Sequence, residues 1–205
     1  MQVSKNIFIN LFVISIIFSF LGSNTIYADE VSEIKEMTKE KVDLVIKTLK
    51  DSSLSKEAKK ESILKTIDGF FDFYRMAKYS LGKKHWKSLS KSGRKEFSKL
   101  FVERLKLSYL DKLDLYTDEE VVVDEAKQKK KNRVEVLTHL VSKDNKMEMK
   151  YKLIKDKKKG WLVYDVEVLG VSIVKTYRSQ FKGYLKKNSM KDLMNRLRSS
   201  EDLGS

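Results

Sequence analysis

The chain has 205 residues with no cysteine and no proline, and its 43 Lys and Arg against 29 Asp and Glu give a net charge of +14. Without cysteine the protein has no disulfide, no thiol nucleophile and no lipid-modified N-terminal cysteine. Without proline there is no rigid linker to mark a boundary, so one domain is the simplest organisation. The positive charge favours anionic partners, or a lysine-rich surface that only keeps the protein in solution.

Residues 1–28 have the three parts of a secretory signal. Lys5 gives a basic start, residues 7–21 form an apolar run, and Ala28 is a small residue before the cleavage site. The run has about 15 residues, fewer than the ~20 that a membrane-spanning helix needs, so cleavage is favoured over a membrane anchor. We expect cleavage after Ala28, export from the cytoplasm, and a mature domain of residues 29–205.

The first half of the mature chain has helical periodicity. Residues 30–50 place apolar side chains on one face, Ser55 suits the N-cap of a second helix, and Gly82 ends that region. Residues 90–116 form the clearest helix, with a wide aromatic face. Apolar residues recur along it every four positions, at Phe97, Phe101, Leu105, Tyr109 and Leu113.

From residue 119 the period changes to two, which predicts antiparallel strands joined by short turns. In the last strand, alternation places Tyr164 and Val166 on one side and Val163 and Asp165 on the other. The predicted strands cover residues 121–123, 133–141, 147–153 and 161–169.

The helical period returns after Gly170, and Ser189 with Asp192 three residues later resembles a capping pair for a last helix. The predicted fold class is therefore α+β, a twisted antiparallel sheet of about four strands with several helices packed on one face.

The sequence offers little support for catalysis. His85 and His139 have no second ligand at helical or hairpin spacing, which argues against a zinc site. Asp165 and Glu167 could act as an acid and a base, but a solvated or helix-facing polar pair is the favoured interpretation. The lysines near residues 127–131 and 155–159 resemble solvated turns without stacking aromatics, which argues against nucleic-acid binding.

Two segments, residues 81–110 and 160–181, carry a family resemblance. The residues concerned are Leu81, Gly82, Trp86, Arg94, Phe97, Phe101, Leu105, Tyr109, Trp161, Tyr164, Asp165, Gly170, Val171, Ser172, Tyr177, Arg178 and Phe181. In order and spacing they resemble the MlaC family, the periplasmic phospholipid-binding proteins of the Mla pathway, also called toluene-tolerance auxiliary proteins. The match departs at Lys91, where relatives often have proline.

The resemblance implies a single lipid-binding domain, residues 29–205, in which helices and a curved sheet enclose an apolar cavity. Phospholipid acyl chains would lie inside as cargo, with the headgroup near solvent and with no cofactor, metal or catalysis. The resemblance also implies a periplasmic carrier, expected to be a monomer, that shuttles lipid between an inner-membrane ABC transporter with an MCE-domain ring and an outer-membrane lipoprotein complex, supporting outer-membrane lipid asymmetry. The alternatives are a hopanoid carrier of the same family, a cone-shaped α+β enzyme, and a structural envelope adaptor with a filled core.

A lipid carrier needs an apolar pocket, because each exposed CH₂ costs about 0.8 kcal/mol and two chains of about 16 carbons cost roughly 25 kcal/mol. The candidate pocket residues are apolar positions that can equally be ordinary core: Phe97, Phe101, Leu105, Tyr109, Val136, Met149, Tyr151, Val166, Val174, Tyr177 and Phe181. Arg178 has two open roles, as a phosphate contact near the pocket mouth or as a brace for Asp165.

Overall fold

The computed structural model describes residues 22–110, 120–143 and 146–199, with side chains from Asp29 onward except those of Tyr109 and Leu110. The helices are α2 (Gly22–Lys50), α3 (Lys56–Phe70), α4 (Phe73–Leu81), α5 (Lys83–Ser88), α6 (Lys91–Leu110), α7 (Ile173–Tyr184) and α8 (Met190–Arg198). The strands are β1 (Glu120–Lys130), β2 (Arg133–Val141), β3 (Lys146–Asp156), β4 (Gly160–Val168) and β5 (Val171–Ser172).

The described helices include none that is long and apolar enough to cross a membrane. Residues 1–21 of the expected signal, and Leu113 of the longest predicted helix, lie outside the described residues. Helix α2 begins at Gly22 and continues through Ala28, the expected cleavage site.

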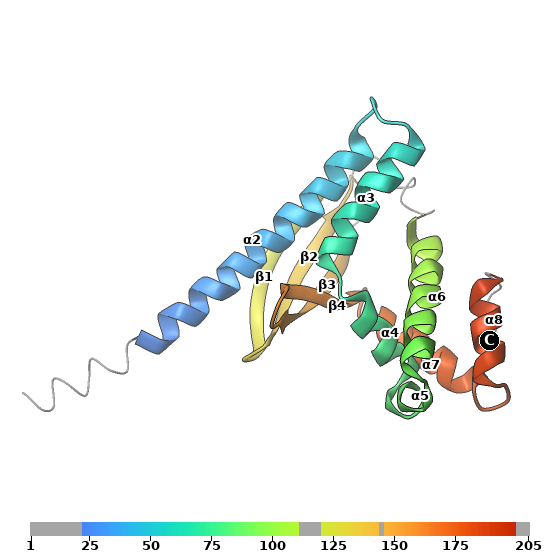
Figure 1. The fold of residues 1–205 in the computed structure, drawn as a ribbon. Helices are drawn as coiled ribbons and strands as arrows, with labels where there is room; N and C mark the ends of the chain where they lie inside the picture. Colours follow the sequence, from blue (N-terminus) through green and yellow to red (C-terminus); the bar gives the residue numbers. More distant parts are fainter. Residues whose placement is uncertain (1–21, 111–119, 144–145, 200–205) are drawn as a thin grey trace, which may run out of the picture.

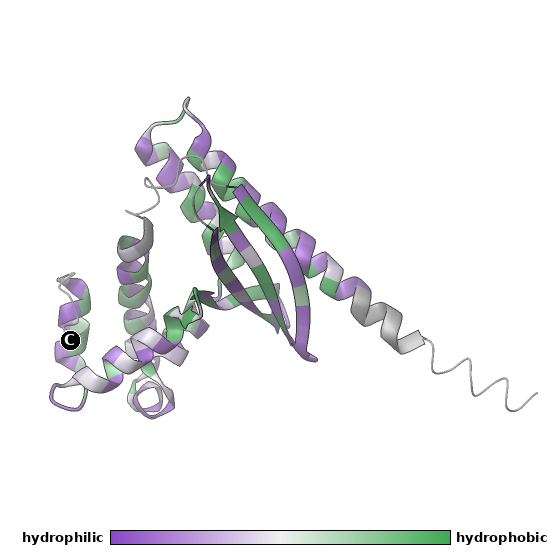
Figure 2. Cartoon of the chain, turned by 180° about the vertical axis from the view of Figure 1, so that it is seen from behind, coloured by the Kyte–Doolittle hydropathy of each residue, from purple (hydrophilic) through white to green (hydrophobic). Residues whose placement is uncertain are grey.

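The strands form one antiparallel meander in the order β1-β2-β3-β4-β5 (Figure 1). The predicted α+β class and the curved antiparallel sheet are confirmed. The sheet has about four long strands, as expected, and a fifth of two residues. The first strand is longer than the predicted residues 121–123: β1 continues to Lys130, so the lysines from Lys127 to Lys130 lie in a paired strand and not in a turn. Helices α2 and α3 cover one face of the sheet, while the other face is free of described helices over β1 to β3 (Figure 2).

The face under α2 and α3 is apolar because alternate residues of each strand point to it. Val136 pairs with Tyr151, which in turn pairs with Val166, so three strands contribute to one buried row. Ile34 of α2 and Phe70 of α3 close over this row, and both are buried. We call this the sheet core.

The prediction that Val163 and Val166 face opposite sides of the sheet, made from simple alternation along β4, is wrong. A register shift opposite Lys152 and Leu153 pairs Leu153 with Val163 and Tyr151 with Val166. An extra residue in one strand reverses the facing of everything beyond it. Val163 and Val166 therefore share the sheet core, where both are buried.

The predicted boundaries at Ser55, Gly82 and Ser189 are confirmed, but the single helix expected from Ser55 past Tyr74 is interrupted at Phe71, whose extended backbone separates α3 from α4. Ser55 accepts a hydrogen bond from the amide of Ala58 at the start of α3. Ser189 and Asp192 form a reciprocal capping box at the start of α8. Gly82 ends α4 with φ of +82°, a conformation that suits glycine.

Helices α4, α6, α7 and α8 pack together beside the β4 edge of the sheet (Figure 1). α7 contacts both α4 and β4, and α6 contacts both α4 and α8. The chain crosses from α3 into this group at Asp72, whose amide donates to the carbonyl of Val163 at 2.8 Å. The molecule therefore has a sheet layer and a helical group that meet along β4.

Candidate functional site

The aromatic face of the longest predicted helix lies in the interior of the helical group. Phe97 and Phe101 of α6 are fully buried and stacked, with ring centroids 6.3 Å apart. Phe181 of α7 meets Phe97 edge to face at 5.7 Å, and Tyr177 meets Phe101 at 5.2 Å. Leu105 and Val174, also predicted, are buried in the same cluster. We call this cluster the helical core; its rings contact one another directly.

The predicted strand residues come together in the sheet core. Val136, Tyr151 and Val166 are buried, and Met149 is half-buried beside them. Tyr151 packs against Phe70 of α3 with ring centroids 6.3 Å apart. Burial raises the pKa of Tyr151 to about 12, so its phenol stays neutral and compatible with apolar surroundings.

Two half-buried residues contact both cores, Phe71 at the α3–α4 junction and Ile173 at the start of α7. Phe71 meets Phe70 edge to face at 5.6 Å and stacks on Phe73 at 5.5 Å. The predicted pocket residues thus fall into two groups, and these two side chains mark the boundary where the groups meet.

A charged contact lies at this boundary between α3 and α6. Lys106 of α6 pairs with Asp68 of α3, with a distance of 2.9 Å between Nζ and Oδ1. The Lys106 ammonium also lies 5.6 Å from the centroid of the Phe73 ring, a cation–π geometry. A cationic group thus sits next to apolar side chains that contact the helical core.

The side chain of Tyr109, another predicted pocket residue, lies outside the described residues. Arg178 is exposed on α7 and lines a surface hollow of about 710 Å³ together with Lys83 and Trp86. No hydrogen bond or ion pair between Arg178 and Asp165 occurs in the described part of the chain. Asp165 accepts instead from Ser172 at 2.7 Å and from the amide of Val174 at 3.1 Å.

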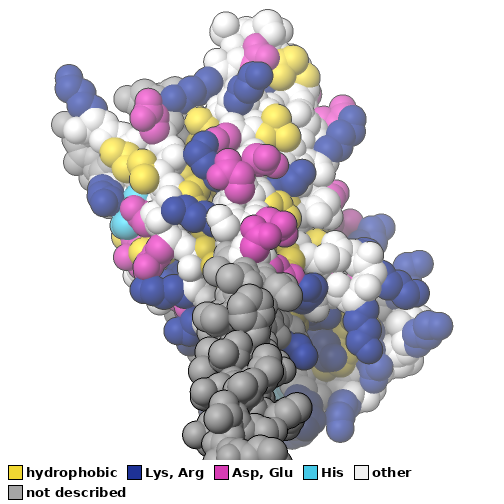
Figure 3. All heavy atoms as spheres, turned by 90° about the vertical axis from the view of Figure 1, so that its left-hand side faces the viewer, with side chains coloured by type: hydrophobic (Ala, Val, Ile, Leu, Met, Phe, Trp, Pro, Cys, Tyr) yellow, Lys and Arg dark blue, Asp and Glu magenta, His cyan; other side chains and the backbone are white. Residues whose placement is uncertain are grey.

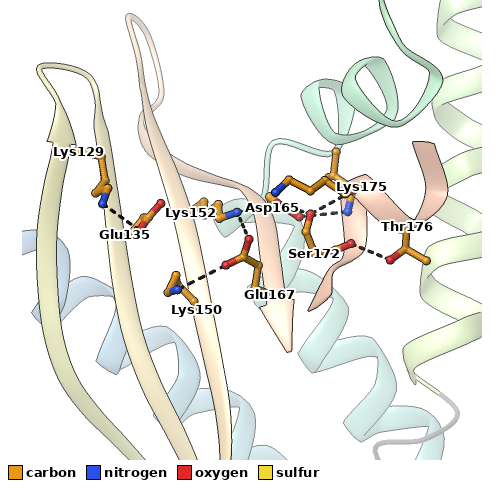
Figure 4. A network of polar contacts seen from close by, with 10 residues as sticks. Lys129, Glu135, Lys150, Lys152, Asp165, Glu167, Ser172, Lys175 and Thr176 are labelled. Carbon is orange, nitrogen blue, oxygen red and sulfur yellow. Dashed lines mark hydrogen bonds and ion pairs between the residues drawn. The ribbon is translucent and has the colours of Figure 1, made fainter. Parts of the chain in front are cut away.

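The carboxylate pair of β4 belongs to an ionic network on the uncovered side of the sheet (Figure 4). Lys152 contacts both Asp165, at 3.4 Å, and Glu167, while Lys150 pairs with Glu167 at 3.5 Å. Burial alone would raise the pKa of Glu167, but hydrogen bonding and the charges of Lys152 and Lys150 outweigh it and hold that pKa below its usual value. A carboxylate kept ionised between two lysines is poorly suited to act as a general acid.

Within residues 22–110, 120–143 and 146–199, no three His, Asp or Glu side chains cluster as metal ligands. His139 is paired with Asp124, with 2.5 Å between Nδ1 and Oδ2, on the outer face of β1 and β2.

Sequence periodicity missed the residues that join the two cores. Phe70, Phe71 and Phe73 form a conspicuous aromatic run, which was a usable signal. Their role depends on the isolated bridge between Phe71 and Val163, a contact between residues 92 positions apart. Lys106 carried no signal, because its partner Asp68 lies on another helix.

The fold and site define a class: an α+β protein in which an antiparallel meander and a helical group each build an apolar core and meet at a shared aromatic boundary. The chain belongs to the MlaC protein family, whose model matches residues 39–199. The family predicted from residues 81–110 and 160–181 is thereby confirmed.

A solved structure from Ralstonia solanacearum, a phospholipid-binding protein in complex with a phospholipid, has the same fold. The TM-score is 0.71 at 21% sequence identity, over 81% of this chain and 95% of the other. At this identity the likeness establishes the shared fold. No curated protein matches the chain significantly.

Proposed function

We propose that the protein is a periplasmic phospholipid carrier and not an enzyme, with the acyl chains held between the sheet core and the helical core. One observation carries the proposal: the buried apolar residues form two separate clusters, and both clusters contact Phe71 and Ile173. Membership of the MlaC family and the fold shared with a phospholipid-bound protein support it.

A two-part interior suits a carrier for an energetic reason. Opening a single packed core to admit two acyl chains would break many contacts at once. Separating two cores along their boundary leaves each one intact, and the acyl chains then replace the apolar contacts that are lost. Burial of two chains of about 16 carbons recovers roughly 25 kcal/mol of unfavourable hydration, enough to offset such a separation.

The headgroup lies near solvent at the α3–α6 side of the boundary. Lys106 is the cation next to the apolar boundary there, and its ammonium can exchange Asp68 for a lipid phosphate. We assign the headgroup of the carried lipid to Lys106 and not to Arg178, which lines the surface hollow beside Trp86.

The carrier acts after export, between an inner-membrane ABC transporter with an MCE-domain ring and an outer-membrane lipoprotein complex, and supports outer-membrane lipid asymmetry. The signal-like residues 1–28 support export. The domain makes its first described side-chain contacts at Glu30, which accepts from Trp161 at 3.0 Å and pairs with Lys155. A mature chain that begins at Asp29 keeps these contacts.

Mass spectrometry of the organic extract of purified mature protein tests the cargo. Phospholipid in near-stoichiometric amount is the expected result. Hopanoid in its place would assign the other carrier class, and an extract without lipid would favour a structural adaptor and refute the proposal.

A charged substitution in the sheet core tests the site. Met149→Asp places a carboxylate on the half-buried edge of the sheet core, where an unpaired charge is costly beside acyl chains. Val122→Asp is the matched control, since Val122 is 48% exposed on β1. We expect Met149→Asp to co-purify with at least tenfold less lipid than the wild type and Val122→Asp to co-purify with the same amount. Circular dichroism should show that both proteins are folded.

A further inference from the structure

A second candidate site lies away from the boundary of the two cores. It is a hollow of about 710 Å³, a size typical of small-ligand pockets, formed where α4, α5, α6 and α7 meet. The buried Trp86 is one of its lining residues, and its indole meets Phe97 of the helical core edge to face at 6.4 Å. The described lining residues include no Asp or Glu.

Cations surround this hollow from every contributing helix. α4 provides Lys78, α5 provides Lys83 and Lys87, α6 provides Arg94, and α7 provides Arg178. Like charges gathered around one hollow repel one another, and an anion that bound among them would reduce this repulsion. We call this cluster the basic hollow.

The sequence concentrates charge at the basic hollow from two distant segments. Residues 73–95 contain eight Lys and Arg without an Asp or Glu, and residues 168–191 contain six without an Asp or Glu. Elsewhere the described lysines are commonly paired with acidic residues, as in the network of Lys150 and Lys152. In Figure 3 the Lys and Arg side chains gather at the lower right, over the end of the molecule that carries α5, with few acidic side chains among them.

The two arginines are positioned differently. Arg94 is fixed, because its Nε donates to the carbonyl of Trp86 at 2.9 Å and its second nitrogen donates to the carbonyl of Lys87 at 3.3 Å. Arg178 lies across Gly82, where a Cβ would be 3.6 Å from Nε, and it forms no ion pair or hydrogen bond with any described residue. Lys78, Lys83 and Lys87 likewise have no side-chain partner in the described chain, so four cationic groups are available to a ligand.

We propose that the basic hollow binds a phosphate group, as a site separate from the one that holds acyl chains. A phosphate offers several acceptor oxygens, which match a planar guanidinium and several ammonium donors converging from three sides. The phosphate can come from a lipid headgroup in a membrane surface or from a small phosphate ester in solution.

The test uses the mature protein with a double substitution, Lys83→Gln and Arg178→Gln. Both side chains are exposed, so the fold is retained, and circular dichroism checks this. The matched control is Lys143→Gln with Lys157→Gln, two exposed lysines in other turns that change the net charge equally. The probes are inorganic phosphate and sn-glycerol 3-phosphate, both at constant ionic strength. Binding is measured by calorimetry and by the NMR signals of the side-chain N–H groups of Trp86 and Arg178.

Binding of both phosphates by the wild type and the control, about tenfold weaker in the hollow variant, is the expected result, since two charge-assisted contacts are lost. If phosphate binding weakened equally in the control, the effect would come from net charge alone and the proposal would be overturned. Absence of phosphate binding, or binding of a polyglutamate peptide in its place, would also overturn it; the second outcome would make the hollow a contact for an acidic protein.

Cosedimentation with vesicles then separates the two phosphate sources. Binding to vesicles of phosphatidylcholine with phosphatidylglycerol, lost in the hollow variant and weakened by salt, assigns the headgroup. Phosphate binding without vesicle binding assigns a small phosphate ester. Lipid extracted from the hollow variant should match the wild type, so failure at this site is distinguishable from failure of the carrier function.

Discussion

Lys106 of α6 and Asp68 of α3 form an ion pair between the helical group and α3, with 2.9 Å between Nζ and Oδ1. Apart from this contact, α6 packs mainly on α4 and α8, and α3 on α2 and β4. The Asp68 side chain is 54% exposed, so the pair is accessible to solvent and inexpensive to break.

Asp68→Asn should therefore loosen the boundary without destabilising the fold. We expect the free energy of unfolding to change by less than ~1 kcal/mol, because exposed ion pairs contribute about that much or less. Transfer of a fluorescent phospholipid between protein and vesicles should become severalfold faster. Glu61→Gln is the control, since it breaks the exposed Glu61–Lys65 pair on the same helix. Equal transfer rates in the two variants would remove Lys106 from the lipid route.

Phe101 is the residue whose substitution best measures the helical core. It is fully buried among Phe97, Tyr177 and Phe181, so Phe101→Ala should lower the free energy of unfolding by about 3–5 kcal/mol. Phe101→Asp should fail to fold, because it buries a charge without a partner. Urea denaturation followed by circular dichroism gives both results, with the 44%-exposed Leu107→Ala on the same helix as control. A folded, lipid-bound Phe101→Asp protein would show that α6 turns another face to the interior.

The ionic network on β4 predicts a pH dependence of stability. The pKa of Glu167 is held below its ordinary value of 4.5 in the folded protein, so its contribution is present above that value and is lost as the pH falls through the folded pKa. The free energy of unfolding should thus decrease below about pH 4.5. Glu167→Gln should reduce this loss, measured as the difference between the two urea-midpoint curves from pH 7 to pH 3. If the urea midpoints of the wild type and Glu167→Gln differ by the same amount at every pH, Glu167 has no role in the pH dependence.

Export predicts a defined N-terminus. Intact-mass measurement of protein from the envelope fraction should give a chain that begins at Asp29, which keeps the contacts of Glu30 with Lys155 and Trp161. The hydrogen bond from Lys155, with that from Trp161, lowers the pKa of Glu30, so this clamp stays charged at neutral pH. A membrane-bound chain that retains Met1 would contradict a released periplasmic carrier.

The sequence predicted most of the interior but not its division. Phe97, Phe101, Tyr177 and Phe181 follow helical spacing, and all are buried together as a helical face requires. Val136 and Tyr151 follow strand spacing and meet in the sheet core. Periodicity identifies the buried face of each element but carries no information on which elements that face will meet, so it could not predict that these residues fall into two clusters.

Local chemistry was decided by the sequence alone. The caps at Ser55 and Ser189, the turn at Gly82, the α+β class and the basic charge all follow from neighbouring residues, whose preferences act within a few positions of the chain. Tertiary structure decided the facing of Val163, through a register shift set by the pairing of β4 with β3. It also decided the contact of Lys106 with Asp68 and the meeting of Arg94 with Arg178 around one hollow. These relationships join residues far apart in sequence, and only packing of the whole chain brings them within contact distance.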